Sequence, residues 1–316
     1  MSNPSIEAVN LSKHYGSFVA LSNLSLKIEG SKCVGFLGPN GAGKTTTLKI
    51  FTDMIRASEG RALINGVDVH LNKKQALSSV GALIESPEIY PALTPREALA
   101  MVADLRGLPR AESRKKIEET VAEVKMSEWL DKKVGKFSKG MKQRINVAAA
   151  LLSDPEIIML DEPTTGLDPR GQSEVRDIVK DLKRKNRLVF MSSHLLNEVQ
   201  EICDEVAMID HGKLIVYDRL SNVTARFSAD GSNSVEIETS KDIDDQTINR
   251  NIASFADVSS VERLDSRKVR IHFSGGSENQ EKLLEDLVAM KIGLISFRPS
   301  SSALEDTYLK LIKDTL

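Results

Sequence analysis

The fold of this 316-residue chain is decided by Gly38-Pro39-Asn40-Gly41-Ala42-Gly43-Lys44-Thr45. The stretch matches the pattern G-x-x-x-x-G-K-[ST], in which a glycine-rich turn joins a strand to a helix. The flanking residues supply that context, because the apolar run Cys33–Leu37 precedes the turn and a helical pattern over Thr45–Ile55 follows it. The sequence therefore predicts a phosphate-binding loop.

Each part of this loop has an expected task. The glycines allow successive backbone N–H groups to point at phosphate oxygens, and the helix presents its positive end to the same anion. We expect the whole loop to bind the phosphates of a nucleotide, with Lys44 on the outer phosphates and the Thr45 hydroxyl on Mg²⁺. Thr46 is expected to contact the α-phosphate, although it could be an ordinary residue of the first helical turn.

Two carboxylates follow a second apolar run. Ile157–Leu160 is typical of a buried strand, and Asp161 and Glu162 come directly after it. Ligands bind at the carboxyl ends of strands in open α/β sheets. We expect Asp161 to hold Mg²⁺ through water and Glu162 to polarise the attacking water as a general base. Taken alone, the pair could also be a solvated acidic turn.

The surrounding sequence predicts an α/β fold of the P-loop NTPase class. Apolar runs at Leu188–Met191 and Val206–Ile209 continue the alternation of strands with helical patterns, which is typical of a parallel sheet covered by helices. Three shorter runs predict a small antiparallel layer, and they are Ile6–Val9, Leu24–Ile28 and Ala62–Ile64. A charged helical stretch over Pro95–Leu152, including Arg114–Val124 and Lys142–Leu152, predicts a helical lobe at about 87–153.

The composition changes after Tyr217, so we divide the chain into domains 1–220 and 235–316, joined by a linker at 221–234 in which Ser228–Ser234 is a flexible connector. The second domain has the element order β-α-β-β-α-β, which predicts a small ferredoxin-like α+β domain. Its expected elements are the strand Val235–Glu238, the helix Asp242–Phe255, the strands Val258–Arg263 and Lys268–Phe273, the helix Glu278–Lys291, the strand Leu294–Phe297 and a final helix Ala303–Ile312.

Charge and composition exclude several classes of function. With 43 Lys and Arg against 45 Asp and Glu, the chain has no general attraction to nucleic acid, and we expect no nucleic-acid partner. No run of about 18 apolar residues is present, and Met1–Val9 lacks the features of a secretory signal, so we expect a protein that stays inside the cell and does not cross the membrane. Cys33 and Cys203 lack metal or redox spacing, which predicts two buried thiols in a reducing cytoplasm.

Three further segments resemble ATP-binding cassette (ABC) proteins. Asp161-Glu162-Pro163-Thr164-Thr165-Gly166-Leu167-Asp168 is similar to their Walker B and D-loop sequence. Phe137-Ser138-Lys139-Gly140-Met141-Lys142-Gln143-Arg144 resembles the ABC signature, and Ser192-Ser193-His194 ends the strand that carries the switch histidine in this family. The resemblance covers the chain from Ile6 to about Arg219.

The resemblance implies a site shared by two subunits. In ABC proteins two cassettes pair head to tail, which implies that Ser138 and Gly140 contact the γ-phosphate of the ATP held by the other subunit. It also implies that His194 holds the γ-phosphate and the attacking water, that Asp168 communicates across the dimer and that Tyr15 stacks on adenine. Without the resemblance, Ser138 would be a helix N-cap, His194 a structural histidine and Tyr15 a packing residue.

The sequence departs from the family at one metal-contacting position. Glu85 replaces a glutamine that contacts Mg²⁺ and water, and glutamate there resembles bacitracin- and lantibiotic-resistance ATPases. The alternative is an interchangeable oxygen ligand that says nothing about the transported substrate. The signature is also a variant, with Lys139 and Met141-Lys142-Gln143 in place of the commonest residues, and the end of the chain resembles the tail domain of daunorubicin-type exporter ATPases.

Together these features predict the Mg²⁺-dependent ATPase of an export-type ABC transporter, located at the cytoplasmic face of the membrane. We expect it to form a dimer of cassettes, in the simplest case a homodimer, and to drive separately encoded permease subunits through residues near Glu85–Leu105. The alternatives are a soluble ABC ATPase and a regulatory cassette without a permease. The substrate cannot be derived from this chain, because membrane subunits select it.

Overall fold

The computed structural model describes residues 3–85, 87–223 and 232–299. Contacts within the chain divide it into two compact units, Met1–Arg219 and Leu220–Leu316. None of the helices in the described ranges combines the length and the apolar character that a membrane crossing needs.

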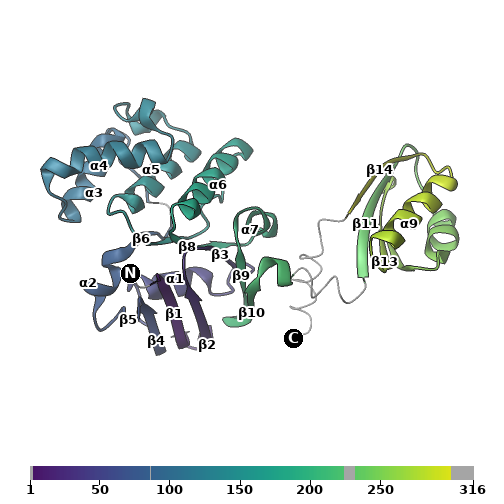
Figure 1. Ribbon diagram of the computed structural model, residues 1–316, viewed down its shortest axis with the longest axis horizontal. Helices are drawn as coiled ribbons and strands as arrows, with labels where there is room; N and C mark the ends of the chain where they lie inside the picture. Colours follow the sequence, from purple (N-terminus) through teal and green to yellow (C-terminus); the bar gives the residue numbers. More distant parts are fainter. Residues whose placement is uncertain (1–2, 86, 224–231, 300–316) are drawn as a thin grey trace. The chain divides into compact units, whose positions relative to one another are not determined.

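A six-stranded sheet forms the centre of the first unit, with the strand order β10-β9-β3-β8-β7-β6 (Figure 1). Its strands are β3 (Cys33–Leu37), β6 (Val80–Leu83), β7 (Ile157–Leu160), β8 (Leu188–Ser193), β9 (Glu205–Asp210) and β10 (Lys213–Arg219). Five of them pair in parallel, and β10 alone in this sheet runs antiparallel to its neighbour. The predicted parallel sheet is confirmed, and its parallel order brings the carboxyl ends of β3, β7 and β8 to one edge.

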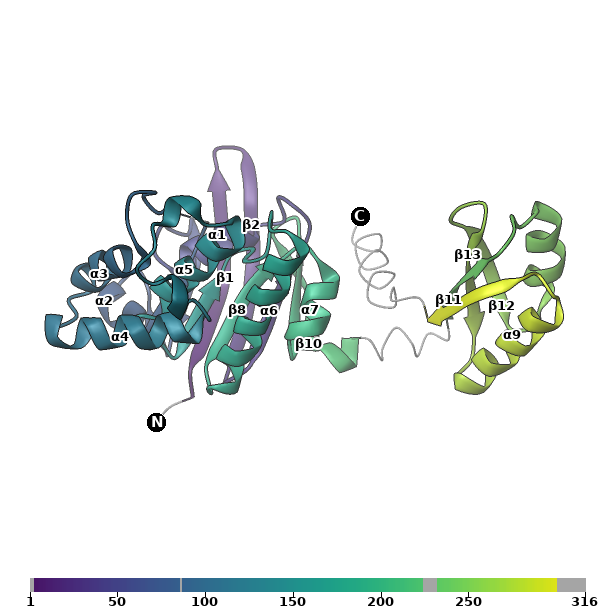
Figure 2. The same cartoon turned by 90° about the horizontal axis from the view of Figure 1, so that it is seen from above.

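Helices cover both faces of this sheet. The helix α1 (Lys44–Phe51) packs on one face, where the Phe51 ring meets the Phe190 ring edge-on at 6.3 Å between centroids. The helices α6 (Pro169–Arg184) and α7 (Leu196–Ile202) lie along the other face (Figure 2). The α7 helix comes so close to β3 that a Cβ on Gly35 would lie 2.6 Å from Val199, so only glycine fits there.

The predicted helix over Thr45–Ile55 is too long at its C-terminal end. The α1 helix ends at Phe51, and Asp53 follows with a left-handed φ of 50°. A left-handed residue just after the last turn is a common way to end a helix. The apolar residue Ile55 packs against the core from the loop beyond the helix, which explains why the hydrophobic pattern continued.

A four-stranded antiparallel sheet with the order β2-β1-β4-β5 packs against α1 and the central sheet in one hydrophobic core. Its strands are β1 (Ser5–Tyr15), β2 (Phe18–Glu29), β4 (Glu59–Ile64) and β5 (Val67–Asp68). The layer is confirmed, but β1 and β2 are much longer than the apolar runs that predicted them. The additional residues of β1 and β2 form a hairpin, and Tyr15 pairs with Phe18 at its tip.

The predicted helical lobe contains three main helices, α3 (Pro95–Leu105), α4 (Arg110–Glu123) and α5 (Lys139–Leu151), with short 3-10 turns at Ser127–Trp129 and Val134–Lys136. A smaller helix, α2 (Lys73–Ala76), and the turn Leu77–Ser79 precede β6. Thr94 and Glu97 form a capping box that fixes the start of α3. Ser138 and Asp168 cap α5 and α6, because each side chain accepts a hydrogen bond from a backbone N–H of the first turn.

The second unit contains an antiparallel sheet with the order β12-β13-β11-β14. Its elements are β11 (Ser232–Thr239), β12 (Val258–Arg263), β13 (Lys268–Ser274), α9 (Ser277–Ala289) and β14 (Leu294–Pro299). The predicted helix Asp242–Phe255 is slightly too long, because the helical residues run from 245 to 254, with a π turn at Thr247–Asn251 and a 3-10 turn at Ile252–Ser254. The Asp244 carboxylate accepts from the Thr247 N–H at 2.7 Å, which caps the helical segment after Asp244.

Parts of the predicted second domain lie outside the described residues. The helix Ala303–Ile312 is among them, as are residues 228–231 of the connector, whereas residues 232–234 belong to β11. The prediction of two buried thiols is confirmed, with Cys33 fully buried and Cys203 8% exposed. Their sulfur atoms lie 3.6 Å apart, a proximity that the sequence does not reveal because the two residues are 170 positions apart.

Candidate active site

The phosphate-binding loop depends on glycines for its shape. A Cβ on Gly38 would lie 2.3 Å from the Ile209 carbonyl oxygen, and one on Gly43 would lie 2.7 Å from that of Ala20. Gly43 also has a φ of 105°, which disfavours any other residue. The loop closes around Lys44, whose ammonium group donates to the carbonyl oxygens of Gly38 at 2.8 Å and Pro39 at 3.0 Å. The lysine is thus fixed at the mouth of the loop.

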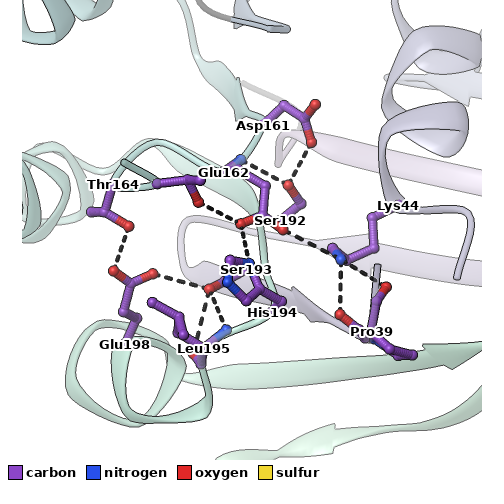
Figure 3. A network of polar contacts seen from close by, with 12 residues as sticks. Pro39, Lys44, Asp161, Glu162, Thr164, Ser192, Ser193, His194, Leu195 and Glu198 are labelled. Carbon is purple, nitrogen blue, oxygen red and sulfur yellow. Dashed lines mark hydrogen bonds and ion pairs between the residues drawn. The ribbon is translucent and has the colours of Figure 1, made fainter. Parts of the chain in front are cut away.

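Thr45 and Asp161 lie side by side, as the sequence predicted. The Thr45 hydroxyl donates to Asp161 at 2.9 Å to one carboxylate oxygen and 3.1 Å to the other. Ser192, at the end of β8, donates from its hydroxyl to Asp161 at 2.6 Å and thereby holds the carboxylate against the sheet edge (Figure 3). One hydroxyl and one carboxylate suit Mg²⁺, which prefers oxygen ligands and keeps several waters beside one or two protein groups.

Glu162 is the most constrained side chain of the site. Its φ of 46° is left-handed, and its backbone N–H donates to the Ser192 hydroxyl at 2.9 Å. One carboxylate oxygen accepts from the Thr165 hydroxyl at 2.8 Å and from His194 Nδ1 at 2.6 Å. The other lies 3.3 Å from the Lys44 ammonium.

These contacts determine the protonation state of Glu162. Burial raises the pKa of the carboxyl group, but the hydrogen bonds from Thr165 and His194 and the charge of Lys44 lower it by more. The net result is a pKa below the ordinary glutamate value. Glu162 is therefore ionised at neutral pH, which is the state required of a group that accepts a proton.

These groups line one open cleft with a volume of about 470 Å³. Its lining comes from the β1–β2 hairpin, the phosphate-binding loop, the start of α1 and the ends of β7 and β8. The lining residues are Tyr15, Phe18, Ala20, Asn40, Gly41, Gly43, Lys44, Thr45, Thr46, Glu162, Thr165 and His194. The cleft thus has an aromatic end formed by the hairpin and a charged end formed by Lys44, Glu162 and His194.

Comparison with known proteins agrees with this geometry. The family model for ABC transporters matches residues 21–165. The bacitracin transport ATP-binding protein BcrA of Bacillus licheniformis is 34% identical over 311 residues, which cover 97% of this chain and 97% of that protein. This chain belongs to the ABC transporter ATP-binding proteins.

Other relatives of this ABC ATPase give the same result. The linearmycin resistance ATP-binding protein LnrL of Bacillus subtilis (strain 168) is 30% identical over 311 residues, covering 98% of this chain and 99% of that protein. Among solved structures, cbiO1 from Clostridium perfringens matches 71% of this chain and 92% of its own with a TM-score of 0.64 and 25% identity. The family hydrolyses ATP, so this chain is an ATPase of that family.

The three residues of this ABC ATPase that are expected to act across a dimer, Ser138, Gly140 and Asp168, lie outside the lining of this cleft. Ser138 caps α5 by accepting from the Met141 N–H at 3.2 Å, and Asp168 caps α6 by accepting from the Gly171 N–H at 3.2 Å. A Cβ on Gly140 would lie 3.1 Å from the Gly171 Cα, so this glycine allows α5 and α6 to approach closely. All three have local structural tasks, and their expected contacts with a second subunit's ATP stay predictions.

The structure brings Glu85 to a neighbour that the sequence did not predict. Its carboxylate accepts from the Lys49 ammonium at 2.6 Å, and this bond is the main cause that raises the pKa of Lys49. Glu85 is 65% exposed and has a left-handed φ of 62°. Its expected role as a ligand of Mg²⁺ stays a prediction.

Four contributors to the site were missed by the sequence analysis. Three of them contact a predicted residue: Phe18 pairs with Tyr15, Thr165 bonds Glu162 and Ser192 bonds Asp161. The alternation of side chains along a strand is the signal that could have indicated Phe18 and Ser192. The fourth is Glu198, a buried carboxylate on α7 that bonds to the segments beside Glu162 and His194. No motif marks it in the sequence.

Proposed function

We propose that this chain is the energy-supplying subunit of an export-type ABC transporter, which binds Mg²⁺ and ATP, pairs with a second cassette and drives separately encoded membrane subunits. The observation that carries the proposal is the convergence of Lys44, Glu162 and His194 in one cleft beside the Thr45–Asp161 pair. Export is supported by the names of the relatives, which refer to bacitracin transport and linearmycin resistance.

Each group would act on a different part of the nucleotide. Lys44 would exchange its bonds to loop carbonyls for the outer phosphates, while the loop N–H groups bind the remaining oxygens. Thr45 and Asp161 would hold Mg²⁺, which neutralises the charge that develops on the phosphates during transfer. Glu162 would take the proton of the attacking water, and His194 would orient Glu162 and contact the γ-phosphate.

A second cassette would complete the site. Ser138 and Gly140 do not line the cleft of their own chain in the described part of the structure. The N-terminus of α5 carries a favourable partial charge for an anion, and the proposal directs it at the ATP of the paired subunit. In a dimer of two such chains assembled on ATP, the cleft of each chain would face the N-terminus of α5 of the other chain.

The membrane subunits would contact the helical lobe. An apolar groove of about 220 Å³ lies between α3, α5 and the segment that follows Glu85. Its rim includes Tyr90, Met101 and Leu105, which are 71%, 51% and 87% exposed. Exposed apolar side chains gathered around a groove are typical of a protein interaction site. This arrangement would hold the chain at the cytoplasmic face of the membrane.

The decisive experiment reconstitutes the protein with the membrane protein encoded beside it and compares its ATPase rate with that of Glu162→Gln. Equal rates would contradict the proposed role of Glu162. A pull-down from membranes separates the transporter subunit from the alternatives, since a soluble ABC ATPase or a regulatory cassette would retain no integral membrane protein.

A further inference from the structure

Glu198 is a carboxylate buried beneath the active site. It lies in the first turn of α7, is 1% exposed, and points its side chain toward the segments that follow β7 and end β8 (Figure 3). One carboxylate oxygen accepts from the Thr164 hydroxyl, and the other accepts from the Ser193 hydroxyl at 2.9 Å. A buried charge is unfavourable unless hydrogen bonds satisfy it, so this arrangement ties Glu198 firmly to both segments.

The two segments are those that hold Glu162. Thr164 directly precedes Thr165, whose hydroxyl donates to Glu162 at 2.8 Å. Ser193 directly precedes His194, which donates to the same carboxylate oxygen at 2.6 Å. Glu198 therefore bonds the hydroxyl of the residue before each of the two donors, and neither of these residues lines the cleft.

Further bonds restrict both segments. The Ser193 hydroxyl also accepts from the Leu195 N–H at 2.9 Å, which fixes the turn into α7. On the other side, the Gln143 side-chain amide of α5 donates to the Pro163 carbonyl at 2.9 Å. The turn after Glu162 is thus held at one residue by α5 and at the next residue by Glu198.

We propose that Glu198 is a positioning residue for ATP hydrolysis, which fixes the spacing between the segments that carry Thr165 and His194. The inference rests on the proposed role of Glu162 as the general base. Without Glu198, the two donors lose their common anchor and Glu162 is held less closely in its reactive position. Because a displacement of about 1 Å can cost about 10²-fold in rate, the loss appears in kcat.

The test compares Glu198→Ala, Glu198→Gln and Glu201→Gln in the full chain, with Mg²⁺ and ATP as substrate. Glu201 is the matched control because it lies on the same helix, where its exposed carboxylate pairs with Arg176 and Lys180. We expect Glu198→Ala to lower kcat by about 10- to 100-fold with KM changed less than about threefold. Glu198→Gln should recover part of the loss, since its amide oxygen replaces one acceptor, and Glu201→Gln should stay within about twofold of the parent protein.

A triple variant separates positioning from a general structural effect. Because Glu198 acts through both donors, adding Glu198→Ala to a protein that already carries Thr165→Ala and His194→Ala should lower kcat by no more than about twofold further. A further loss of kcat as large as that caused by Glu198→Ala alone would overturn the proposal. A Glu198→Ala variant as active as Glu201→Gln would overturn it too. Should Glu198→Ala fail to fold, Glu198→Gln decides, and a kcat equal to that of the parent protein overturns it. A Glu162→Gln variant with full activity would instead contradict the role of Glu162 as the general base, and the proposal for Glu198 would fall with that role.

Discussion

The Lys44 ammonium lies 3.3 Å from Glu162 Oε1, so the side chain that grips phosphate and the carboxylate that is to activate water contact each other across the cleft. Both side chains are largely shielded from solvent, at 5% and 21% exposed. The pair neutralises two charges while Lys44 also bonds the loop carbonyls. Phosphates that reach Lys44 must therefore compete with Glu162 for it.

The first prediction concerns Glu162→Gln. Loss of a general base lowers kcat by about 10²–10⁴-fold, whereas ATP binding should persist or strengthen because the amide no longer competes for Lys44. Steady-state hydrolysis and equilibrium binding of ATP measure the two effects separately. The control is Glu156→Gln, an exposed site at the opposite end of the same strand, which should leave both unchanged. Equal losses in binding and turnover would contradict this division of roles.

A second prediction concerns His194. Because its Nδ1 donates to Glu162 at 2.6 Å, His194→Ala should lower kcat by about 10²-fold or more while the protein still binds ATP. His70→Ala provides the control, since His70 also pairs with a carboxylate, Asp53 at 3.3 Å, but away from the cleft. A His194→Ala variant with unchanged kcat would show that the bond to Glu162 has no part in turnover.

The third prediction uses the lowered pKa of Glu162. A carboxyl group with a pKa lower in the folded than in the unfolded state stabilises the protein above the unfolded pKa, about 4.3, and this contribution is lost as pH falls through the folded value. The stability difference between the parent protein and Glu162→Gln should thus be constant near neutral pH and shrink below about pH 4.3. Trp129, the single tryptophan, lies in the first unit and reports its unfolding by fluorescence. A difference independent of pH would refute the expectation.

The sequence predicted those parts of the site that depend on local geometry. The loop around Lys44 was found because its glycines must precede a helix, and Thr45 was placed beside Asp161 because parallel strands end at one edge. These arguments need only the loop and the positions at which parallel strands end, which short-range patterns indicate. The Thr45–Asp161 distance of 2.9 Å agrees with them.

Other features depend on packing between distant segments and have no local signal. The Glu198 bonds require α7 to lie against β8 and beside the turn that follows β7, and Thr164 is 34 residues away from Glu198 in the chain. The same holds for the 3.6 Å approach of Cys33 and Cys203. The pairing of Glu85 with Lys49 joins residues that are 36 positions apart, which a motif comparison could not reveal.

A fourth prediction concerns the aromatic end of the cleft. Tyr15 and Phe18 are a register pair in the β1–β2 hairpin and line the cleft with 49% and 60% of their surface exposed. Stacking of a base on an aromatic ring is worth about 1–3 kcal/mol, so Tyr15→Ala should weaken ATP binding by about 5- to 150-fold, and Phe18→Ala should weaken it in the same direction. Neither variant should change the affinity for inorganic tripolyphosphate, which lacks the base.

Val19→Ala is the control for this comparison. Val19 follows Phe18 in the strand and is 44% exposed, but it is not a lining residue of the cleft. It should leave the affinities for ATP and tripolyphosphate unchanged. Equal weakening of both ligands by Tyr15→Ala would indicate a distorted phosphate loop and contradict base stacking.

The last prediction tests the apolar groove of the helical lobe. Leu105 is 87% exposed at its rim, so Leu105→Glu should not disturb the core, but it places a charge where the membrane subunit is proposed to bind. We expect the variant to lose at least about 10-fold in affinity for the membrane subunit, equivalent to about 1.4 kcal/mol, while its basal ATPase rate stays within about twofold. Leu71→Glu is the matched control, because Leu71 is 74% exposed outside this groove. If both variants retain the membrane subunit equally, the groove is excluded as the docking site, because a charge placed at the rim of an occupied apolar interface lowers the affinity of binding.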